Sequence, residues 1–439
     1  MPTLPRTLGF CDLTLLTIGA VIGSGIFLVP GAVLRQVGGS IGLSLLVWLS
    51  GGVLSLLGAM TYAELSSMNP SAGGLYVYVR DCFGRFPAFL FGWTLFFVVS
   101  TGSNATLSVA FSTYLGEIIP LTPWMAKGIA VAVLLVVMAV NVRGTRQSAD
   151  LTNWTTAIKM AAILGMSVAL LWLGRGFRNP GNILWPVHYS GTLVSGFGAA
   201  MISVLWAYEG WQFGTYNAGE AVNPQRDYPR ALFLGASALI VLYMLANTGY
   251  LAALGSAAVA QSDSVAAASM AAVFSPAAAR VVALAILISI FSATNTTALT
   301  TPRVFYAMAA DGLFFKRLAE VHPRFGTPAI AIVSSSAWSI VLALSGTFED
   351  LLTYVIFVGW IFYALAAGSV FVYRRRQPDR FRPYRVPGYP WTPLVFILAA
   401  GALVANTVFA APRDAAAGLG ITLLGAPAYF IWRARAAPK

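Results

Sequence analysis

Long apolar segments alternate with short polar loops along almost the whole chain. Twelve of them reach the roughly 20 residues that a helix needs to cross a hydrocarbon core about 30 Å thick. We expect membrane-spanning helices at 12–34, 42–66, 86–115, 123–141, 153–174, 191–217, 229–253, 280–309, 328–345, 349–373, 391–411 and 415–432. These segments are too long and too evenly apolar for the alternating strands of a membrane barrel. The pattern therefore predicts an all-α integral membrane protein.

Two of the predicted helices contain residues that interrupt a helix near the middle of the membrane. The first holds Gly23, Ser24 and Gly25, and the sixth holds Glu209 and Gly210. Each glycine disfavours a helix by about 1 kcal/mol relative to alanine. Broken backbone at this depth is tolerated only where it lines a cavity within the protein. We therefore expect the first and sixth helices to be broken around a shared site.

The two predicted breaks are five helices apart. Corresponding interrupted helices in two halves of a membrane protein are typical of an inverted repeat with the binding site between the halves. We expect one transporter domain, in which residues 12–174 form the first five-helix repeat and residues 191–373 the second, inverted one. The last two helices, within 391–432, would lie outside the repeat.

The broken helices would expose peptide groups of both polarities. Amides at the start of the outer half-helix favour an anion, and free carbonyls favour a cation. An amino acid backbone has both charges on neighbouring atoms. The expected carboxylate-binding amides belong to Gly23, Ser24 and Gly25, and the expected ammonium-binding carbonyls to Thr17, Ile18, Gly19, Trp206 and Ala207.

Ionisable residues inside membrane helices are rare and usually functional. Glu209, which has aromatic neighbours, either faces the substrate or only bonds to the broken backbone. Lys159 either extends to the interface or is buried among oxygen atoms, where its ammonium group can replace a bound cation or carry a proton. Candidate oxygen partners lie in the eighth helix, where Ser289, Ser292, Thr296 and Thr300 share one face and Asn295 lies next to it.

The composition and charge distribution agree with a membrane protein. Hydrophobic residues make up 58% of the chain and charged residues 10%. If the N-terminus is cytoplasmic, 20 of the 27 Lys and Arg residues lie in cytoplasmic loops or ends, as expected for a multi-pass protein of the cytoplasmic membrane with both termini inside. The net charge of +12 follows this topology, and its even spread does not indicate nucleic-acid binding.

The chain carries little that indicates catalysis or a cofactor. The two histidines, His188 and His322, fall in predicted loops on opposite sides of the membrane, so we expect no histidine-based metal site. A phosphate-binding loop motif is absent, which argues against direct ATP coupling. We expect neither enzyme activity nor a cofactor. Cys11 and Cys82 are both predicted on the cytoplasmic side, where a structural disulfide is not expected.

Four motifs, in order and at the right spacing, resemble those of the amino acid, polyamine and organocation (APC) transporters. They are closest to those of the bacterial relatives of the L-type amino acid transporters. The motifs are IGAVIGSGIF at 18–27, YAELSSMNPSAGGLYVYVRDCFGRFPAFLFGW at 62–93, WAYEGWQFGTYNAGEAVNPQRDYPRAL at 206–232 and TPRVFYAMAADGLFFKRLAEVHPRFGTPAIAI at 301–332. The similarity extends from about residue 8 to about residue 395.

This resemblance implies a leucine-transporter-type fold that works by alternating access. It implies that the substrate carboxylate binds at Gly23 to Gly25, that Trp206 closes over the substrate as a gate, and that Lys159 occupies the place of the sodium ion of sodium-driven relatives. In the vertebrate members a cysteine between the third and fourth helices links a glycoprotein partner. The corresponding stretch here, 116–124, has no cysteine. A disulfide-linked partner is therefore not expected.

Three hypotheses of function follow from the sequence. The leading one is a permease for neutral L-amino acids that works by exchange or by proton symport. The second is a permease for cationic amino acids or polyamines, in which Glu209 contacts a second positive charge. The third is a sensor or channel, which the absence of a long cytoplasmic loop and of charged rings disfavours.

Overall fold

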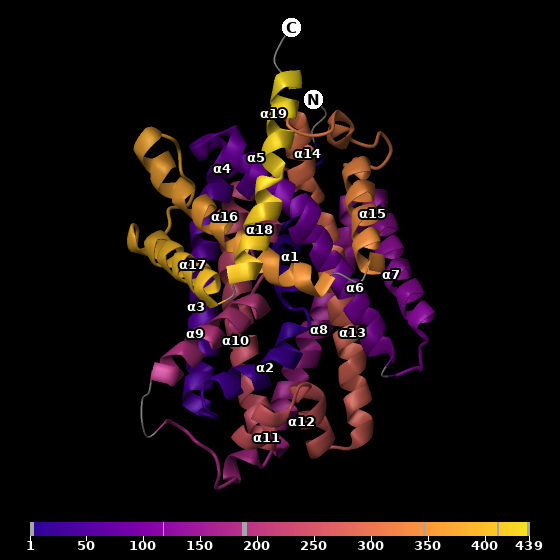
Figure 1. The fold of residues 1–439 in the computed structure, drawn as a ribbon, viewed down its shortest axis with the longest axis vertical. Helices are drawn as coiled ribbons and strands as arrows, with labels where there is room; N and C mark the ends of the chain where they lie inside the picture. The colour runs from indigo at the N-terminus through magenta and orange to yellow at the C-terminus, as the bar shows by residue number, and fades with distance from the viewer. Residues whose placement is uncertain (1–3, 117, 187–190, 346–347, 411, 437–439) are drawn as a thin grey trace.

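The computed structural model describes residues 4–116, 118–186, 191–345, 348–410 and 412–436, and His188 lies outside these ranges. Within them the protein is helical, and its only β pairing consists of two isolated bridges, Leu8 with Ala221 and Ser40 with Ile183. Figure 1 shows the helices as one elongated bundle, with α19 near one end and α11 and α12 at the other.

The first half of the chain, up to residue 220, contains nine α-helices and three short helical segments within the described residues. They are α1 (Phe10–Val21), α2 (Gly25–Gln36), α3 (Ile41–Met68), α4 (Leu75–Phe83), α5 (Arg85–Thr94), the π-helical η1 (Leu95–Val99), α6 (Ser100–Gly116), α7 (Pro123–Arg143), α8 (Thr145–Leu173), the 3-10 turn η2 (Gly176–Arg178), α9 (Gly191–Ala207) and the 3-10 helix η3 (Phe213–Glu220).

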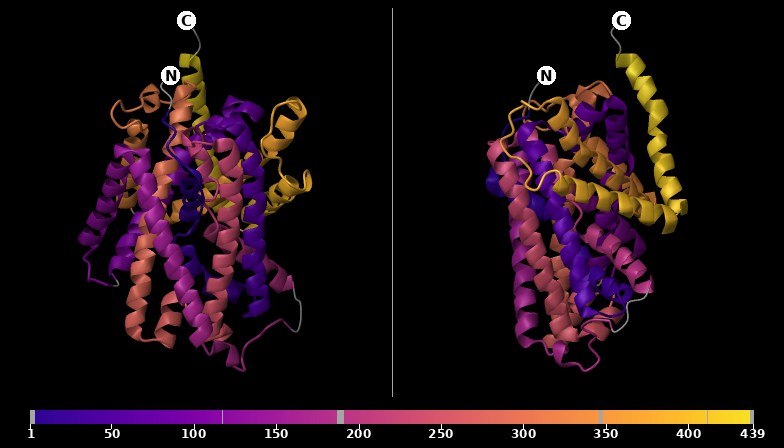
Figure 2. Two further views of the ribbon diagram at one scale, coloured as in Figure 1. Left: turned by 180° about the vertical axis from the view of Figure 1, so that it is seen from behind. Right: turned by 90° about the vertical axis from the view of Figure 1, so that its left-hand side faces the viewer.

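The second half, from residue 224 on, is also helical within the described residues. It contains α10 (Pro224–Leu254), α11 (Ser256–Gln261), α12 (Val265–Val273), α13 (Pro276–Thr300), α14 (Pro302–Ala310), the 3-10 helix η4 (Lys316–Ala319), α15 (Ala329–Ser345), α16 (Phe348–Arg376), α17 (Trp391–Ala410), α18 (Pro412–Leu423) and α19 (Gly425–Ala436). The α17–α19 segment lies at the edge of the molecule, where it packs against α3, α5 and α16 (Figure 2).

The structure bears out a helical membrane protein, whereas the count of twelve spans stays a prediction. Among the described residues, eight helical segments are long and apolar enough to cross a membrane, and α1 and α2 form a ninth when taken as one span bent by 47°. The sixth and ninth predicted segments correspond to the shorter helices α9 and α15, and the tenth to α16.

One helix begins earlier than the hydrophobic pattern predicts. The fifth segment was expected to begin at 153, but α8 begins at Thr145, because polar residues of its first two turns face protein rather than lipid. Ser148 and Thr152 in these turns are fully buried. The longer helix puts Lys159 at its centre instead of a third of the way along.

A buried ion pair joins α14 to η3, and a threonine of α8 is hydrogen-bonded to the same carboxylate. Arg303 of α14 and Glu220 of η3 are both 0% exposed, with 2.7 Å between Arg303 Nε and Glu220 Oε2. The Glu220 carboxylate also accepts hydrogen bonds from Thr145 (2.6 Å) and Asn217 (2.7 Å). Arg303 lies near the end of the predicted span 280–309, where the sequence gives no sign of a buried partner, so this network is a finding of the structure.

Removing one member of this pair is expected to destabilise the protein strongly. Arg303→Gln leaves the buried Glu220 carboxylate without its counter-charge, a change that typically costs about 3–5 kcal/mol. We expect a clearly lower thermal midpoint for the purified protein in detergent. The matched control is Arg317→Gln, because Arg317 and Glu320 form an exposed pair at 3.8 Å that contributes little. Equal midpoints for the two variants would contradict the role of the buried pair.

Candidate functional site

The first helix is broken where the sequence predicts. α1 ends at Val21, α2 begins at Gly25, and the axes of the two helices differ by 47°. The Gly23 amide donates to the carbonyl of Val21 at 2.8 Å, which is a tight turn rather than a helical bond. Because the first amides of a helix have no partner within it, the start of α2 presents N–H groups at the break.

The sixth predicted helix is also broken. α9 ends at Ala207, a turn follows, and the chain continues from Phe213 as the 3-10 helix η3. Gly210 allows this turn, because its φ of +118° lies in a region that other residues rarely adopt. The unwinding predicted around Glu209 is thus present, but the second part of the span is a 3-10 helix rather than an α-helix.

The two breaks contact each other directly. A Cβ atom on Gly210 would lie 2.7 Å from the carbonyl oxygen of Ala20, and one on Gly25 would lie 2.9 Å from Cβ of Ala207. Both distances are shorter than real Cβ contacts. Glycine at these positions therefore lets the backbones of α1, α2 and α9 approach closely.

A cavity of about 100 Å³ lies between the breaks. The predicted site residues that line it are Gly23, Ser24, Gly25, Trp206, Ala207 and Glu209. A Cβ atom on Gly23 would meet no atom within 4 Å, so the backbone there faces open space. The structure thus brings together the six predicted residues on either side of the two breaks.

The remaining predicted backbone contacts lie beside this cavity. Thr17, Ile18 and Gly19 are buried in α1, but the cavity wall is formed by Ala20 and Val21, which lie further along the same helix. The Ile18 carbonyl accepts the amide of Ile22 at 3.0 Å.

The predicted carbonyls at the second break also have partners. The carbonyl of Trp206 accepts the amide of Glu209 at 3.1 Å, and the carbonyl of Ala207 accepts the Tyr243 hydroxyl at 3.2 Å. Each oxygen keeps a second lone pair.

Other cavity residues were not identified from the sequence. Ser103, Thr106 and Leu107 reach the cavity from α6, Ala293 and Thr297 from α13, and Phe213 from η3. The Thr106 hydroxyl is buried and has no hydrogen-bond partner among the described residues. The sequence shows small polar residues in both helices, but it does not show which face of each helix turns inward.

The carboxylate of Glu209 lines the cavity and is also held by neighbouring side chains. Its Oε1 accepts hydrogen bonds from Gln212 Nε2 at 2.5 Å and from the Tyr363 hydroxyl at 2.6 Å. Tyr363 belongs to α16, so this contact links the second break to a residue 154 positions later in the chain. Glu209 therefore lines the cavity and is held by two side chains, rather than by the broken backbone that the sequence suggested as the alternative partner.

Lys159 is buried behind the first break. Its side chain is 1% exposed, and Nζ donates to the carbonyl oxygens of Gly19 at 2.8 Å and Ile22 at 2.7 Å. The ammonium group thus compensates two carbonyls at the unwound end of α1. Extension of this side chain to the membrane interface, the alternative reading, is wrong for this structure.

The polar residues of the eighth predicted span lie in α13 and divide between two tasks. Ser289 shares the Ile22 carbonyl with Lys159, through a hydrogen bond of 2.9 Å. Ser292 accepts from Thr155, and Asn295 donates to Thr152, both residues of α8. Ser289 therefore lies at the lysine site, while Ser292 and Asn295 hold α13 against α8.

Comparison with known proteins identifies the family of the chain. Residues 8–426 match the family described as amino acid permease. The chain belongs to this family, within the APC superfamily. It is 31% identical to the serine/threonine exchanger SteT of Bacillus subtilis (strain 168) over 439 residues, covering 99% of this chain and 98% of the relative.

Two mammalian relatives extend the comparison. The b(0,+)-type amino acid transporter 1 of Mus musculus is 31% identical over 93% of this chain and 84% of its own length. The cystine/glutamate transporter of Homo sapiens is 30% identical over 94% of this chain and 83% of its own length. This permease is accordingly a multi-pass membrane protein that transports amino acids.

The glycine at the second break offers a direct test of the site. Gly210→Ala forces a side chain into an unfavourable φ and against the Ala20 carbonyl, with a backbone strain of about 1–2 kcal/mol. We expect a lower thermal midpoint and a reduced rate of amino acid uptake in liposomes. Gly128→Ala is the control, since a Cβ atom there would meet nothing within 4 Å. Wild-type uptake by Gly210→Ala would show that close contact of the breaks is not required.

Proposed function

We propose that this permease exchanges small neutral L-amino acids across the cytoplasmic membrane. The observation that carries the proposal is the 100 Å³ cavity between the two helix breaks, because it presents backbone dipoles of both polarities in a volume suited to a small substrate. The substrate carboxylate accepts from the amides of Ser24 and Gly25, since the amide of Gly23 already donates to the carbonyl of Val21 within the turn. Its ammonium group faces the carbonyls at the ends of α1 and α9.

The other cavity residues support a small polar side chain. Ser103, Thr106 and Thr297 contribute hydroxyl groups, while Leu107 and Phe213 limit the space. The buried Thr106 hydroxyl is available for a hydrogen bond to the substrate. A site that hydrogen-bonds a substrate hydroxyl discriminates strongly against analogues that lack it. Serine and threonine, which the name of the Bacillus subtilis relative gives as exchanged, fit these features.

Lys159 stabilises the first break in place of a bound cation. Its ammonium group bridges α8 to the carbonyls of Gly19 and Ile22, as a sodium ion would. Unpaired carbonyls in such a dry environment cost several kcal/mol each. The orientation of the amides at Gly23 to Gly25 therefore depends on this lysine.

Alternating access is the proposed transport mechanism, in a leucine-transporter-type fold with twelve spans and a 5+5 inverted repeat. Trp206 serves as the gate, since it lines the cavity and its ring lies close to Gly25. Both termini are placed in the cytoplasm by the excess of positive residues on that side. Exchange needs neither a cofactor nor a disulfide-linked partner, and Cys11 and Cys82 are free thiols.

Uptake by the reconstituted protein tests this proposal. Liposomes preloaded with unlabelled serine should accumulate labelled serine by counterflow, at similar rates at two pH values if exchange is not coupled to protons. Absence of counterflow across a full panel of amino acids would overturn the proposal. Strong stimulation of uptake by an inward proton gradient would show that the mechanism is proton symport rather than exchange.

Replacing Lys159 tests its role at the break. Lys159→Ala leaves the Gly19 and Ile22 carbonyls without their ammonium partner, so we expect counterflow to fall by at least about tenfold, the effect of losing one hydrogen bond to a charged group. Lys127→Ala is the matched control, because Lys127 is exposed on α7. Wild-type rates for Lys159→Ala would remove the lysine from the mechanism.

Glu209 supports a second candidate function, the transport of cationic amino acids. Its carboxylate lines the cavity and would pair with a positively charged side chain. Glu209→Gln keeps a hydrogen-bond acceptor for Tyr363 but removes the charge. Under the leading proposal, serine counterflow persists in this variant and the wild type does not take up arginine. Arginine counterflow by the wild type that is lost in Glu209→Gln would favour the second candidate.

A further inference from the structure

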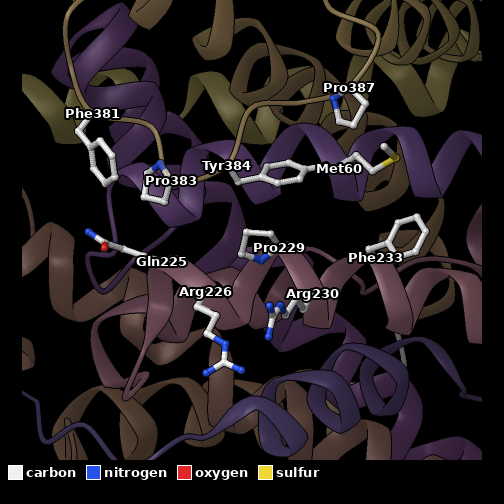
Figure 3. Close-up of a pocket in the computed structure, with 10 residues that line it drawn as sticks. All are labelled: Met60, Gln225, Arg226, Pro229, Arg230, Phe233, Phe381, Pro383, Tyr384 and Pro387. Carbon is white, nitrogen blue, oxygen red and sulfur yellow. The ribbon is translucent and has the colours of Figure 1, made fainter.

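A second, larger groove of about 720 Å³ lies on the outside of the helix bundle, away from the cavity described above. It is formed by the first turns of α10, by α3 and by the loop between α16 and α17. Figure 3 shows ten residues that line it, and five of these, from Gln225 to Phe233, follow one another along α10.

One edge of the groove is positively charged. Arg226 and Arg230 are four residues apart in α10 and lie next to each other, across Pro229 from the loop residues (Figure 3). Both are exposed. In the part of the chain that the structure describes, neither guanidinium group has an ion-pair partner. This edge is therefore free to bind an anion.

The rest of the groove is apolar and extends along α3 and α10, away from the helix ends that carry the charges. Met60 lies eight residues before the end of α3, a distance of about 12 Å along the helix. Phe233 is nine residues into α10 and 46% exposed. The charges thus lie at the ends of the helices and the apolar surface lies deeper, which matches the arrangement of headgroup and acyl chain in a phospholipid.

The loop that forms the opposite wall is firmly anchored. The carboxylate of Glu64 in α3 accepts hydrogen bonds from Arg374 at 2.9 and 2.7 Å and from the backbone amide of Val386 at 2.7 Å. Glu64 is 1% exposed. The segment that carries Phe381, Pro383 and Tyr384 is therefore fixed in place before any ligand arrives.

Tyr384 contributes a polar atom to this wall. Burial, together with the negative charge of Glu64, raises the pKa of Tyr384 to about 12, and its hydroxyl is protonated at neutral pH as any tyrosine hydroxyl is. A protonated phenol can donate a hydrogen bond to an anionic oxygen. The groove thus has two guanidinium groups at one edge and a hydroxyl-bearing side chain on the opposite wall, with Pro229 between them (Figure 3).

We propose that this groove binds an anionic glycerophospholipid, with its phosphate between Arg226 and Arg230 and an acyl chain along Pro229, Tyr384, Met60 and Phe233. Basic pockets between membrane helices on the cytoplasmic side are suited to such headgroups. A lipid, rather than a free phosphate ion, is the proposed occupant because the larger part of the groove is apolar. The site is separate from the transport cavity and does not depend on the proposed substrate.

Native mass spectrometry of the full-length protein in mild detergent tests the proposal. The protein is titrated with phosphatidylglycerol or with phosphatidylcholine of the same acyl chains. We expect the wild type to bind phosphatidylglycerol about tenfold more tightly, and the Arg226→Gln/Arg230→Gln variant to lose this preference, because the loss of one charge-assisted hydrogen bond corresponds to about that factor. Arg226→Lys/Arg230→Lys, which keeps both charges, should retain part of the preference.

A matched control separates this groove from the general positive charge of the protein. Arg85→Gln/Arg143→Gln removes two other exposed arginines and should leave the affinity unchanged. Equal phosphatidylglycerol affinities for the two double glutamine variants would overturn the proposal, as would a complete loss of preference in the double lysine variant. Displacement of phosphatidylglycerol by an equal concentration of inorganic phosphate would instead assign the site to free anions and contradict the proposal that its occupant is a lipid.

Discussion

The free energy of leaving peptide groups unpaired in a dry environment is the constraint on which the architecture depends. Each unpaired group inside a membrane costs several kcal/mol, yet the chain breaks two helices there. The structure meets this cost with side chains. Lys159 and Ser289 bond to carbonyls at the first break, and the Tyr243 hydroxyl lies within hydrogen-bond distance of carbonyls at both breaks. The amides at the start of α2 have no partner within that helix and lie beside the cavity.

These side chains also explain why the elements around the site are packed so closely. Gly19 approaches α8 so tightly that a Cβ atom there would lie 2.5 Å from the hydroxyl of Thr156. This approach brings Lys159 within reach of the backbone. Asn295 and Ser292 then hold α13 against the same helix. Small residues therefore allow the helices to pack closely, and polar side chains then form hydrogen bonds across these close contacts.

Much of the site could be predicted from the sequence, because its residues are unusual for a membrane helix. Gly23, Ser24 and Gly25 disfavour a helix, and Glu209 and Lys159 are charges in apolar surroundings, so each is visible in a single sequence. Ser103 and Thr297 are ordinary residues of membrane helices. Only the rotation and packing of α6 and α13 bring them to the cavity, and no local pattern encodes that arrangement.

The pairing of Arg303 with Glu220 was missed for a related reason. Arg303 falls at the end of a predicted span, where an arginine is normally exposed to water or lipid headgroups. Its burial follows from the 3-10 helix that continues the sixth span and delivers Glu220 beside α14. The number of spans likewise depends on where short helices such as α9 and α15 lie relative to a bilayer, which hydropathy alone does not determine.

The backbone of Glu220 also binds the segment that precedes α1. Its carbonyl oxygen accepts the amides of Thr7 and Leu8 at 2.8 and 3.0 Å, and the amide of Val222 donates to Leu8 at 2.9 Å. The segment that precedes α1 is thus hydrogen-bonded to the residues at the end of η3. Three backbone hydrogen bonds therefore hold the two broken spans together at the ends that lie away from the breaks, independently of the cavity between them.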